Sequence, residues 1–339
     1  MRRWLLAALA CLLAGASSLA WLAAGLWAPA DSQGADTVFR IGPGDTLRIV
    51  ADRLHGERLI TLSPSILVYW GRVTGAERSI KSGEYDLGPR MTPAEILQKL
   101  VSGNVKTHAV TLPEGIRLDE VAARLERAQI AEATDFLEHA RRPEIARALG
   151  IEADSCEGYV YPETYRFRRP TPPGEILERT LSEFTSRLTA EDRAKIQEMG
   201  RTLHEIVTLA SIVEKETAVD EERALIAAVF WNRLKKRMRL QSDPTVIYGL
   251  IETKGSFDGD IRYRDLRADN PYNTYTRHGL PPGPIANTTI ESIRAVLEPA
   301  DVPYLYFVSR NDGTHEFSTT LADHTRAVKR YQNRRKPEG

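Results

Sequence analysis

The sequence predicts an α+β fold in which short strands and amphipathic helices follow one apolar N-terminal segment. Three observations lead to this prediction: an uncharged N-terminal run, a strand–turn–helix pattern that occurs twice, and several longer segments with the apolar spacing of helices. We expect residues 1–30 to form a membrane anchor, 31–150 a repeated α/β region, and 151–339 a mixed helical and short-strand domain.

The N-terminal run is long enough to cross a membrane. An uncharged stretch extends from Trp4 to Trp27, and a bilayer core takes about 20 residues. Basic residues precede it and acidic residues follow it: Arg2 and Arg3, then Asp31 and Asp36. This asymmetry predicts a cytoplasmic N-terminus, a single transmembrane helix and an extracytoplasmic body. A cleaved signal peptide is the alternative, but Pro29 between two alanines is a poor cleavage site and the run is long for one.

The overall charge argues against nucleic acid as a partner. The chain carries 46 basic and 46 acidic residues, so no net positive field is available to attract a polyanion. The basic residues 334–336 form a short C-terminal tip, which we interpret as a solvated end. Cys11 lies inside the apolar run, so Cys156 is expected to be an unpaired thiol.

A strand–turn–helix pattern occurs twice in the region 31–150. Residues 38–54 align without gaps onto residues 109–125, 71 positions later, and each copy reads as a strand, a Gly/Pro turn and a helix. Apolar residues match in the two helices: Leu47 and Leu118, Val50 and Val121, Ala51 and Ala122, Leu54 and Leu125. The opening Gly44-Asp45-Thr46-Leu47 resembles LysM modules, which bind polymers of N-acetylglucosamine. A small packing unit without a ligand is the alternative.

Further segments complete the expected order of elements. We predict helices at residues 64–70, 92–100, 131–149, 173–188, 203–217 and 220–237. Thr92 stands where a helix cap is favoured, and Pro93 fits the first helical position. Residues 82–87 are predicted as a turn and strand. The aromatic-rich segment 157–167 is predicted as an extended piece, either a core strand or a platform for sugar rings.

Glu214 is the strongest candidate for chemistry in the segment 203–217. At about 100° per residue it falls on the apolar face of this helix, between Val207 and Ala210. A carboxylate on a core-facing stripe needs a partner, or its pKa rises until it keeps its proton. A carboxyl protonated near neutral pH is what a general acid requires. A buried structural ion pair is the competing interpretation.

Two polar, irregular segments suit a ligand with many hydroxyl groups. Residues 239–249 and 270–285 combine amides and hydroxyls with prolines and glycines that fix the backbone. Neither contains a phosphate-binding glycine loop or a Gly-x-Ser-x-Gly nucleophile motif. His278, His315 and His324 lack the spacing of metal ligands, so we expect no metal and no cofactor. His315, beside a turn, stays a cleft candidate.

Motifs between residues 210 and 308 follow one another in a defined order. They are Ala210-Ser211-Ile212-Val213-Glu214-Lys215-Glu216-Thr217, Phe230-Trp231-Asn232-Arg233-Leu234, residues 238–249, Tyr272-Asn273-Thr274-Tyr275, and residues 279–285 and 304–308. Upstream, Leu112-Pro113-Glu114-Gly115, Glu157-Gly158 and Pro162-Glu163-Thr164-Tyr165 belong to the same series. Together they resemble the YceG-like family of endolytic murein transglycosylases over essentially the full chain.

This resemblance implies an activity and a set of site residues. The activity is that of a lyase that cleaves the β-1,4 bond between N-acetylmuramic acid and N-acetylglucosamine in nascent glycan strands, leaving a 1,6-anhydro end. Glu214, the first glutamate of Val-Glu-Lys-Glu, is implied as the catalytic acid. Peptidoglycan is the implied substrate, peptidoglycan synthases are candidate partners, and the inner (plasma) membrane is the implied location, with a periplasmic body. Residues expected to position the sugar are Gln241, Ser242, Asp243, Tyr248, Asn273, Tyr275 and Glu163.

Two other functions stay open at this point. A muramidase, which hydrolyses the same bond, needs a second carboxylate near Glu214, with Asp243, Glu163 or Glu216 eligible. A non-catalytic wall-binding scaffold would rely on the LysM-like region and leave Glu214 dispensable.

Overall fold

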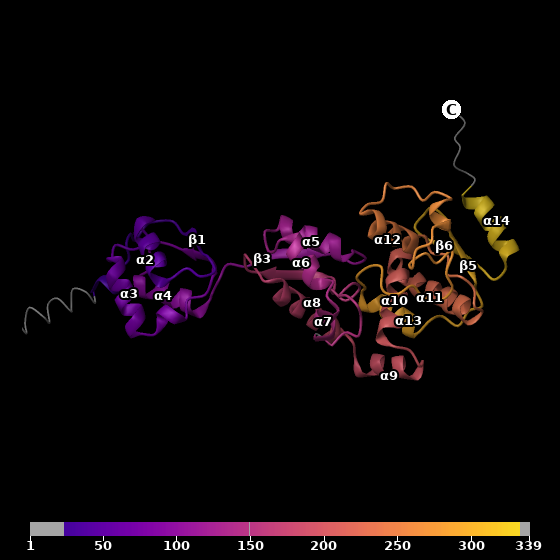
Figure 1. The fold of residues 1–339 in the computed structure, drawn as a ribbon, viewed down its shortest axis with the longest axis horizontal. Helices are drawn as coiled ribbons and strands as arrows, with labels where there is room; N and C mark the ends of the chain where they lie inside the picture. Colours follow the sequence, from indigo (N-terminus) through magenta and orange to yellow (C-terminus); the bar gives the residue numbers. More distant parts are fainter. Residues whose placement is uncertain (1–23, 149, 333–339) are drawn as a thin grey trace, which may run out of the picture. The chain divides into compact units, whose positions relative to one another are not determined.

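The computed structural model describes residues 24–148 and 150–332, and Figure 1 shows the order of the helices and strands. Most of the expected anchor, together with Cys11 and the basic tip at residues 334–336, lies outside these ranges. Within them, no helix is both long enough and apolar enough to cross a bilayer. The transmembrane helix therefore stays a prediction.

Contacts along the chain divide it into two compact units, which are described separately. Unit 1 contains the described residues up to His108 together with Arg166–Pro170, and unit 2 contains Ala109–Tyr165 and the chain from Thr171 onward. This division differs from the expected boundary near residue 150, because the second copy of the strand–turn–helix pattern belongs to unit 2.

Unit 1 combines two antiparallel strands with helices around one apolar core. Its elements are β1 (Thr37–Ile41), α2 (Leu47–Gly56), α3 (Pro64–Val73), the 3-10 turn η1 (Ala76–Arg78), β2 (Gly83–Leu87) and α4 (Pro93–Ser102). Phe39 of β1 lies opposite Tyr85 of β2, and both side chains are fully buried. Thr92 forms a capping box with Glu95 at the start of α4, as its position predicts.

Unit 2 begins with the second copy of the pattern, and this copy too is a strand and a helix. Most of strand β3 (His108–Leu112) belongs to unit 2, where it precedes α5 (Leu118–Arg127) and pairs with β4 (Glu163–Phe167). Two helices, α6 (Ala133–Ala140) and α7 (Pro143–Ala148), replace the single helix predicted at residues 131–149. The prediction missed the break, which Pro143 explains because a proline disfavours helical backbone in the residue before it.

The rest of unit 2 is mainly helical. The elements are α8 (Pro173–Arg187), α9 (Ala190–Glu198), α10 (Leu203–Glu216), α11 (Asp220–Lys235), α12 (Asp243–Lys254), η2 (Asp265–Arg267), α13 (Ile290–Leu297), β5 (Tyr306–Ser309), β6 (His315–Ser318) and α14 (Leu321–Tyr331). The sequence predicted α8, α10 and α11, but not α9 or the elements from α12 onward. Buried residues of α12 lie on several sides of the helix, so they give no one-sided apolar pattern.

Helix α10 lies at the centre of unit 2. It packs against α11, α12 and α13, and every residue from Ile206 to Glu214 is buried. Thr208 and Ser211 are therefore inside as well, although their side chains are polar. Their hydroxyls donate to carbonyls one turn earlier in the helix, and Ser211 accepts the backbone N–H of Ile285 at 3.0 Å. These bonds make polar side chains compatible with a buried helix.

Candidate active site

Glu216, the last residue of α10, is half-buried among polar groups. The Ser242 hydroxyl donates a hydrogen bond of 2.5 Å to its Oε1. Burial raises the pKa of the Glu216 carboxyl to about 7, and the negative charge of Asp243 also raises it. The bond from Ser242 and the positive charge of Arg233 lower that pKa. At neutral pH a large fraction of Glu216 therefore holds a proton and can donate it.

Ser242 is fixed at the start of α12 by neighbouring hydroxyl groups. Its backbone N–H donates to Thr274 Oγ1 at 3.0 Å. Thr245 Oγ1 donates to the Ser242 carbonyl at 2.6 Å and lies 2.8 Å from Thr274 Oγ1. Gln241, just before, has a φ of 50°, a left-handed conformation that residues other than glycine rarely adopt. These contacts hold the Ser242 hydroxyl on Glu216.

Asp243 and Tyr275 form the more exposed side of the same site. The Tyr275 hydroxyl donates to Asp243 Oδ1 at 2.6 Å. Burial raises the pKa of Tyr275, and the hydrogen bond and charge of Asp243 raise it further, so the phenol stays neutral. Asp243 itself is exposed, so its second oxygen is open to a ligand or to water.

Arg233, a buried residue of α11, places a positive charge near Glu216. It is 7% exposed and donates from Nε to the Leu305 carbonyl at 2.7 Å and from Nη1 to the Leu240 carbonyl at 2.6 Å. Its guanidinium carbon lies 5.2 Å from the centre of the Tyr306 ring. The arginine is thereby fixed at a site where its charge stabilises a negative charge on Glu216.

Glu214 has the partners of a structural group. Its side chain is 2% exposed, and its Oε2 accepts hydrogen bonds from Thr289 N at 2.9 Å and Thr289 Oγ1 at 2.7 Å. Thr289 caps the N-terminus of α13, where a carboxylate is electrostatically favoured. Arg223 Nη2 lies 3.9 Å from Glu214 Oε1. Of the two interpretations that the sequence left open, these contacts match the buried ion pair.

The other expected site residues divide into groups. Ser242, Asp243 and Tyr275 lie together beside Glu216, with Gln241 next to them. Tyr248 is buried, with its hydroxyl 3.4 Å from Glu157 Oε2. Asn273 is 2% exposed and bonds to backbone carbonyls of its own loop. Glu163 is exposed on β4 and pairs with Arg187 at 3.5 Å, without a contact to the Glu216 site. His315 pairs with Glu222 at 2.6 Å, an arrangement that fixes β6 to α11.

The sequence analysis considered Glu216 only as a possible second carboxylate, and it missed three residues that build the site. Thr245 and Thr274 fix Ser242, and Arg233 supplies the charge near Glu216. All three stand inside the motifs that carry the family resemblance, so the signal was available. Their roles were hidden because they depend on contacts between segments that are 17 to 32 residues apart in the sequence.

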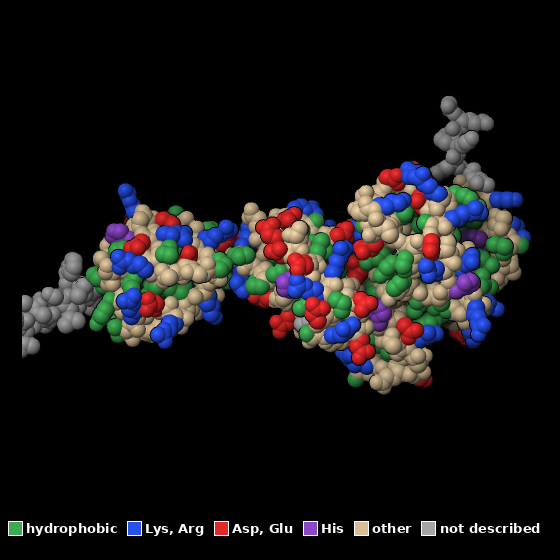
Figure 2. Space-filling view, in the orientation of Figure 1, with side chains coloured by type: hydrophobic (Ala, Val, Ile, Leu, Met, Phe, Trp, Pro, Cys, Tyr) green, Lys and Arg blue, Asp and Glu red, His purple; other side chains and the backbone are tan. Residues whose placement is uncertain are grey.

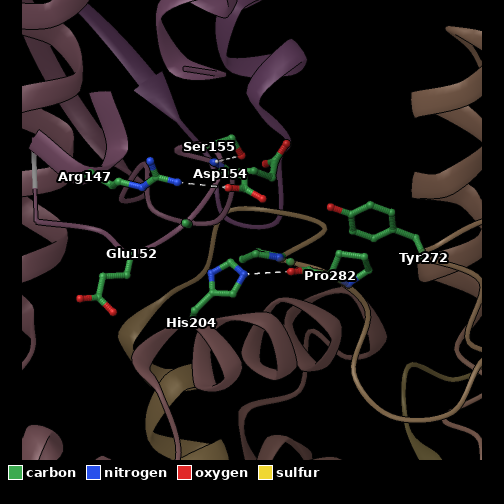
Figure 3. A pocket seen from close by; sticks show the side chains of 11 residues that line it. Arg147, Glu152, Asp154, Ser155, His204, Tyr272 and Pro282 are labelled. Carbon is green, nitrogen blue, oxygen red and sulfur yellow. Dashed lines mark hydrogen bonds and ion pairs between the residues drawn. The ribbon is translucent and has the colours of Figure 1, made fainter. Parts of the chain in front are cut away.

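A second carboxyl with an altered pKa, Glu157, lies elsewhere in unit 2. It is 5% exposed, accepts the Leu118 N–H at 3.2 Å, and forms part of the wall of a cavity shown in Figure 3. Burial raises the pKa of Glu157 to about 8, the Leu118 bond opposes this, and the charges of Asp119 and Glu252 reinforce it. Its two protein partners, Leu118 and Tyr248, make it a link between α5 and α12.

The fold and the site define an α+β protein organised around a half-buried carboxylic acid at the end of a central helix. The sequence model of the YceG-like family matches residues 39–330, and the chain belongs to that family. The resemblance read from the motifs is thereby confirmed.

Relatives with named functions support this membership. The endolytic murein transglycosylase of Bacillus subtilis is 31% identical over 319 residues, covering 89% of this chain and 87% of that protein. The Streptococcus pneumoniae serotype 2 protein of the same name is 29% identical over 283 residues, and the match spans 51% of its length. A crystal structure of a yceG-like protein from Listeria monocytogenes has a TM-score of 0.59 at 31% identity, covering 87% of this chain and all of that chain.

Proposed function

We propose that this protein is an endolytic murein transglycosylase, a lyase of peptidoglycan, and that Glu216 is its catalytic acid. The activity is that named for the Bacillus subtilis and Streptococcus pneumoniae relatives. The observation that carries the residue assignment is the environment of Glu216, a half-buried carboxyl with a pKa near 7 that accepts a hydrogen bond from Ser242. Glu214, which the resemblance implied for this role, is engaged by Thr289 and Arg223 instead.

One carboxyl can perform both proton transfers of the reaction. Protonated Glu216 gives its proton to the glycosidic oxygen as the bond from that oxygen to C1 of N-acetylmuramic acid breaks, and the oxygen keeps the electron pair. The resulting carboxylate then takes the proton of the C6 hydroxyl while O6 bonds to C1. No water is consumed, and the product is a 1,6-anhydro end.

The neighbours of Glu216 suit the second half of this cycle. Ser242 donates to the carboxylate that forms, and the fixed charge of Arg233 favours the same form. Asp243 and Tyr275, on the more exposed side, offer an acceptor and a phenol to sugar hydroxyls. The developing positive charge at C1 would be stabilised by the carboxylate of Asp243.

A muramidase is the second candidate, because Asp243 is a carboxylate close enough to influence Glu216. In that mechanism Asp243 would act as nucleophile or would activate a water, and the product would be a reducing end. The Tyr275 bond occupies one oxygen of Asp243, which favours a positioning role for this residue.

We further propose that the body is extracytoplasmic and held at the inner membrane by the segment Trp4–Trp27, with its N-terminus in the cytoplasm. The apolar length and the flanking charges support this topology. The strand–turn–helix order of β1 and α2 supports a LysM-like role of unit 1 in glycan binding. Synthases of the same polymer are the partners that a strand-cleaving enzyme would need nearby.

The residue assignment is tested by replacing each glutamate with glutamine in the full-length protein. Glu216→Gln should lower strand cleavage by about 10²–10⁴-fold, because it removes the proton that is transferred. Glu214→Gln should retain most of the activity per folded molecule, since it changes a structural contact. Circular dichroism and glycan pulldown provide the folding and binding controls. Loss of activity only in Glu214→Gln would return the catalytic role to Glu214.

A further inference from the structure

A cavity of about 560 Å³ in unit 2 takes no part in the chemistry described above. It is lined by the loop around Glu157, by the N-terminal end of α10 and by the Pro282–Pro284 turn, and Glu216 is not among its lining residues. Figure 3 shows Arg147, Asp154 and Ser155 on one side of the cavity and Tyr272 opposite, with its hydroxyl directed inward.

The floor of the cavity is rigid. His204 Nε2 lies 3.0 Å from the Pro282 carbonyl, and His204 Nδ1 lies 3.0 Å from the Tyr159 hydroxyl. A carbonyl only accepts, so Nε2 carries the proton and Nδ1 accepts from Tyr159. Both ring nitrogens are therefore used within the protein, and His204 acts as a wall of the cavity. Gly283 also lines the cavity, and a Cβ there would lie 3.4 Å from the His204 ring and 3.6 Å from the Tyr272 hydroxyl, so a larger side chain would project between these two walls.

The rim of the cavity carries exposed charges of both signs. Arg147 and Asp154 approach each other only to 3.7 Å, and their side chains are 65% and 96% exposed. Glu152 is exposed as well. Such a loose surface pair contributes little to stability, so its members are free to bind a ligand. Elsewhere the two signs are interspersed over the face shown in Figure 2, without an extended patch of one sign.

Two segments, α10 and the loop at residues 270–285, contribute both to the cavity and to the site of Glu216. His204 and Glu216 stand at opposite ends of α10, about 18 Å apart along the axis at 1.5 Å per residue. The loop at residues 270–285 supplies Tyr275 to the acid and Tyr272 to the cavity. The acid and the cavity therefore share α10 and this loop, and a separation of about 18 Å is within the reach of a polymeric ligand.

We propose that this cavity binds the peptide attached to the murein glycan, through the charged groups of that peptide. The inference rests on the proposed function, since it assumes a murein strand at Glu216. An amidase leaves one lactyl carboxylate on each muramic acid and no amine, whereas a stem peptide that is not cross-linked carries several free carboxylates and a free amine. Arg147 matches such a carboxylate, and Asp154 and Glu152 match the amine. The Tyr272 ring and the Pro282–Pro284 turn cover the apolar part of the peptide.

The test compares cleavage of peptide-bearing strands with that of strands stripped of peptide by an amidase. Wild-type protein should have a higher kcat/KM on peptide-bearing strands. Arg147→Ala should lower kcat/KM on peptide-bearing strands at least about tenfold, the effect expected from the loss of one charge-assisted hydrogen bond. The same substitution should leave kcat/KM on the stripped strands unchanged. Gly283→Leu should do the same by filling the cavity. Arg262→Ala, which removes an exposed pair with Asp258 outside the cavity, and Gly174→Leu, which projects into open space, are the matched controls.

Equal wild-type activity on both substrates would overturn the proposal, as would an Arg147→Ala loss that is the same on both. Binding provides a readout that does not depend on cleavage. A soluble disaccharide–tetrapeptide should shift the NMR signals of the full-length protein in detergent, and the disaccharide alone should shift those near Tyr272 and His204 far less. If the protein cleaves neither kind of strand, the proposed function fails. Peptide binding without cleavage would still support the assignment of the cavity. Absence of both cleavage and peptide binding would reject that assignment.

Discussion

The pKa of Glu216 makes the pH dependence of cleavage a readout of the site. With a pKa of about 7, roughly nine tenths of the acid is protonated at pH 6 and roughly one tenth at pH 8. A glutamate at the ordinary value of 4.5 would be protonated in about one molecule in 300 at pH 7, so its environment increases the available acid about 150-fold. We expect kcat/KM on glycan strands to fall about tenfold for each pH unit well above 7.

Two substitutions should shift the fall in activity at high pH in opposite directions along the pH axis. Ser242→Ala removes a hydrogen bond that favours the charged carboxylate, so the pKa of Glu216 should rise and activity should persist to higher pH. Asp243→Asn removes a neighbouring negative charge, so that pKa should fall and activity should be lost at lower pH. Each shift should be roughly half a pH unit or more.

The assay is the initial rate of soluble fragment release from purified strands between pH 5 and pH 9, at low substrate. Asp258→Asn, an exposed aspartate distant in sequence, serves as the control and should leave the profile unchanged. Two results would refute the assignment of Glu216: a shift of the pH profile in the same direction for Ser242→Ala and Asp243→Asn, or a wild-type activity that already falls near pH 4.5.

Three further predictions follow from the structure. Glu214→Gln leaves Arg223 without its full counter-charge and should lower stability by about 1–3 kcal/mol, measured as a drop in the Tm of unit 2. Because the pKa of Glu157 is raised to about 8, its contribution to stability is complete below about pH 4.5 and is lost as the pH rises through 8. Thermal melts at pH 5 and pH 8 should therefore show that the Tm of Glu157→Gln, relative to that of the wild type, is higher at pH 8 than at pH 5. A periplasm-dependent reporter fused after Asp36 should be active, and activity of a cytoplasm-dependent reporter there would contradict the topology.

Local sequence signals predicted much of the fold. Thr92, Pro93 and Glu95 together specify the start of α4, because a capping box needs only residues three positions apart. The apolar spacing likewise located α10 within one residue of its end. Such features depend on neighbours within one or two turns, which a single sequence displays directly.

The site was less predictable, because its chemistry depends on tertiary contacts. The helical wheel placed Glu214 on the apolar face, and it took that position as the sign of either a partner or a raised pKa. In the structure every residue from Ile206 to Glu214 is buried, so a buried position on α10 does not by itself mark a catalytic residue. The two glutamates differ in their partners. Glu214 contacts Thr289 and Arg223, whereas Glu216 accepts a hydrogen bond from Ser242. No spacing within α10 could reveal those contacts.

The mass of the primary product tests the central claim most directly. Purified glycan strands are incubated with wild-type protein, and the new muramic acid ends are examined by mass spectrometry before any further enzyme is added. Closure of O6 on C1 predicts ends lighter than the hydrolysed form by one water, absent with Glu216→Gln. Reducing muramic acid ends as the primary product would contradict the account and favour a muramidase with Asp243 as its second carboxylate.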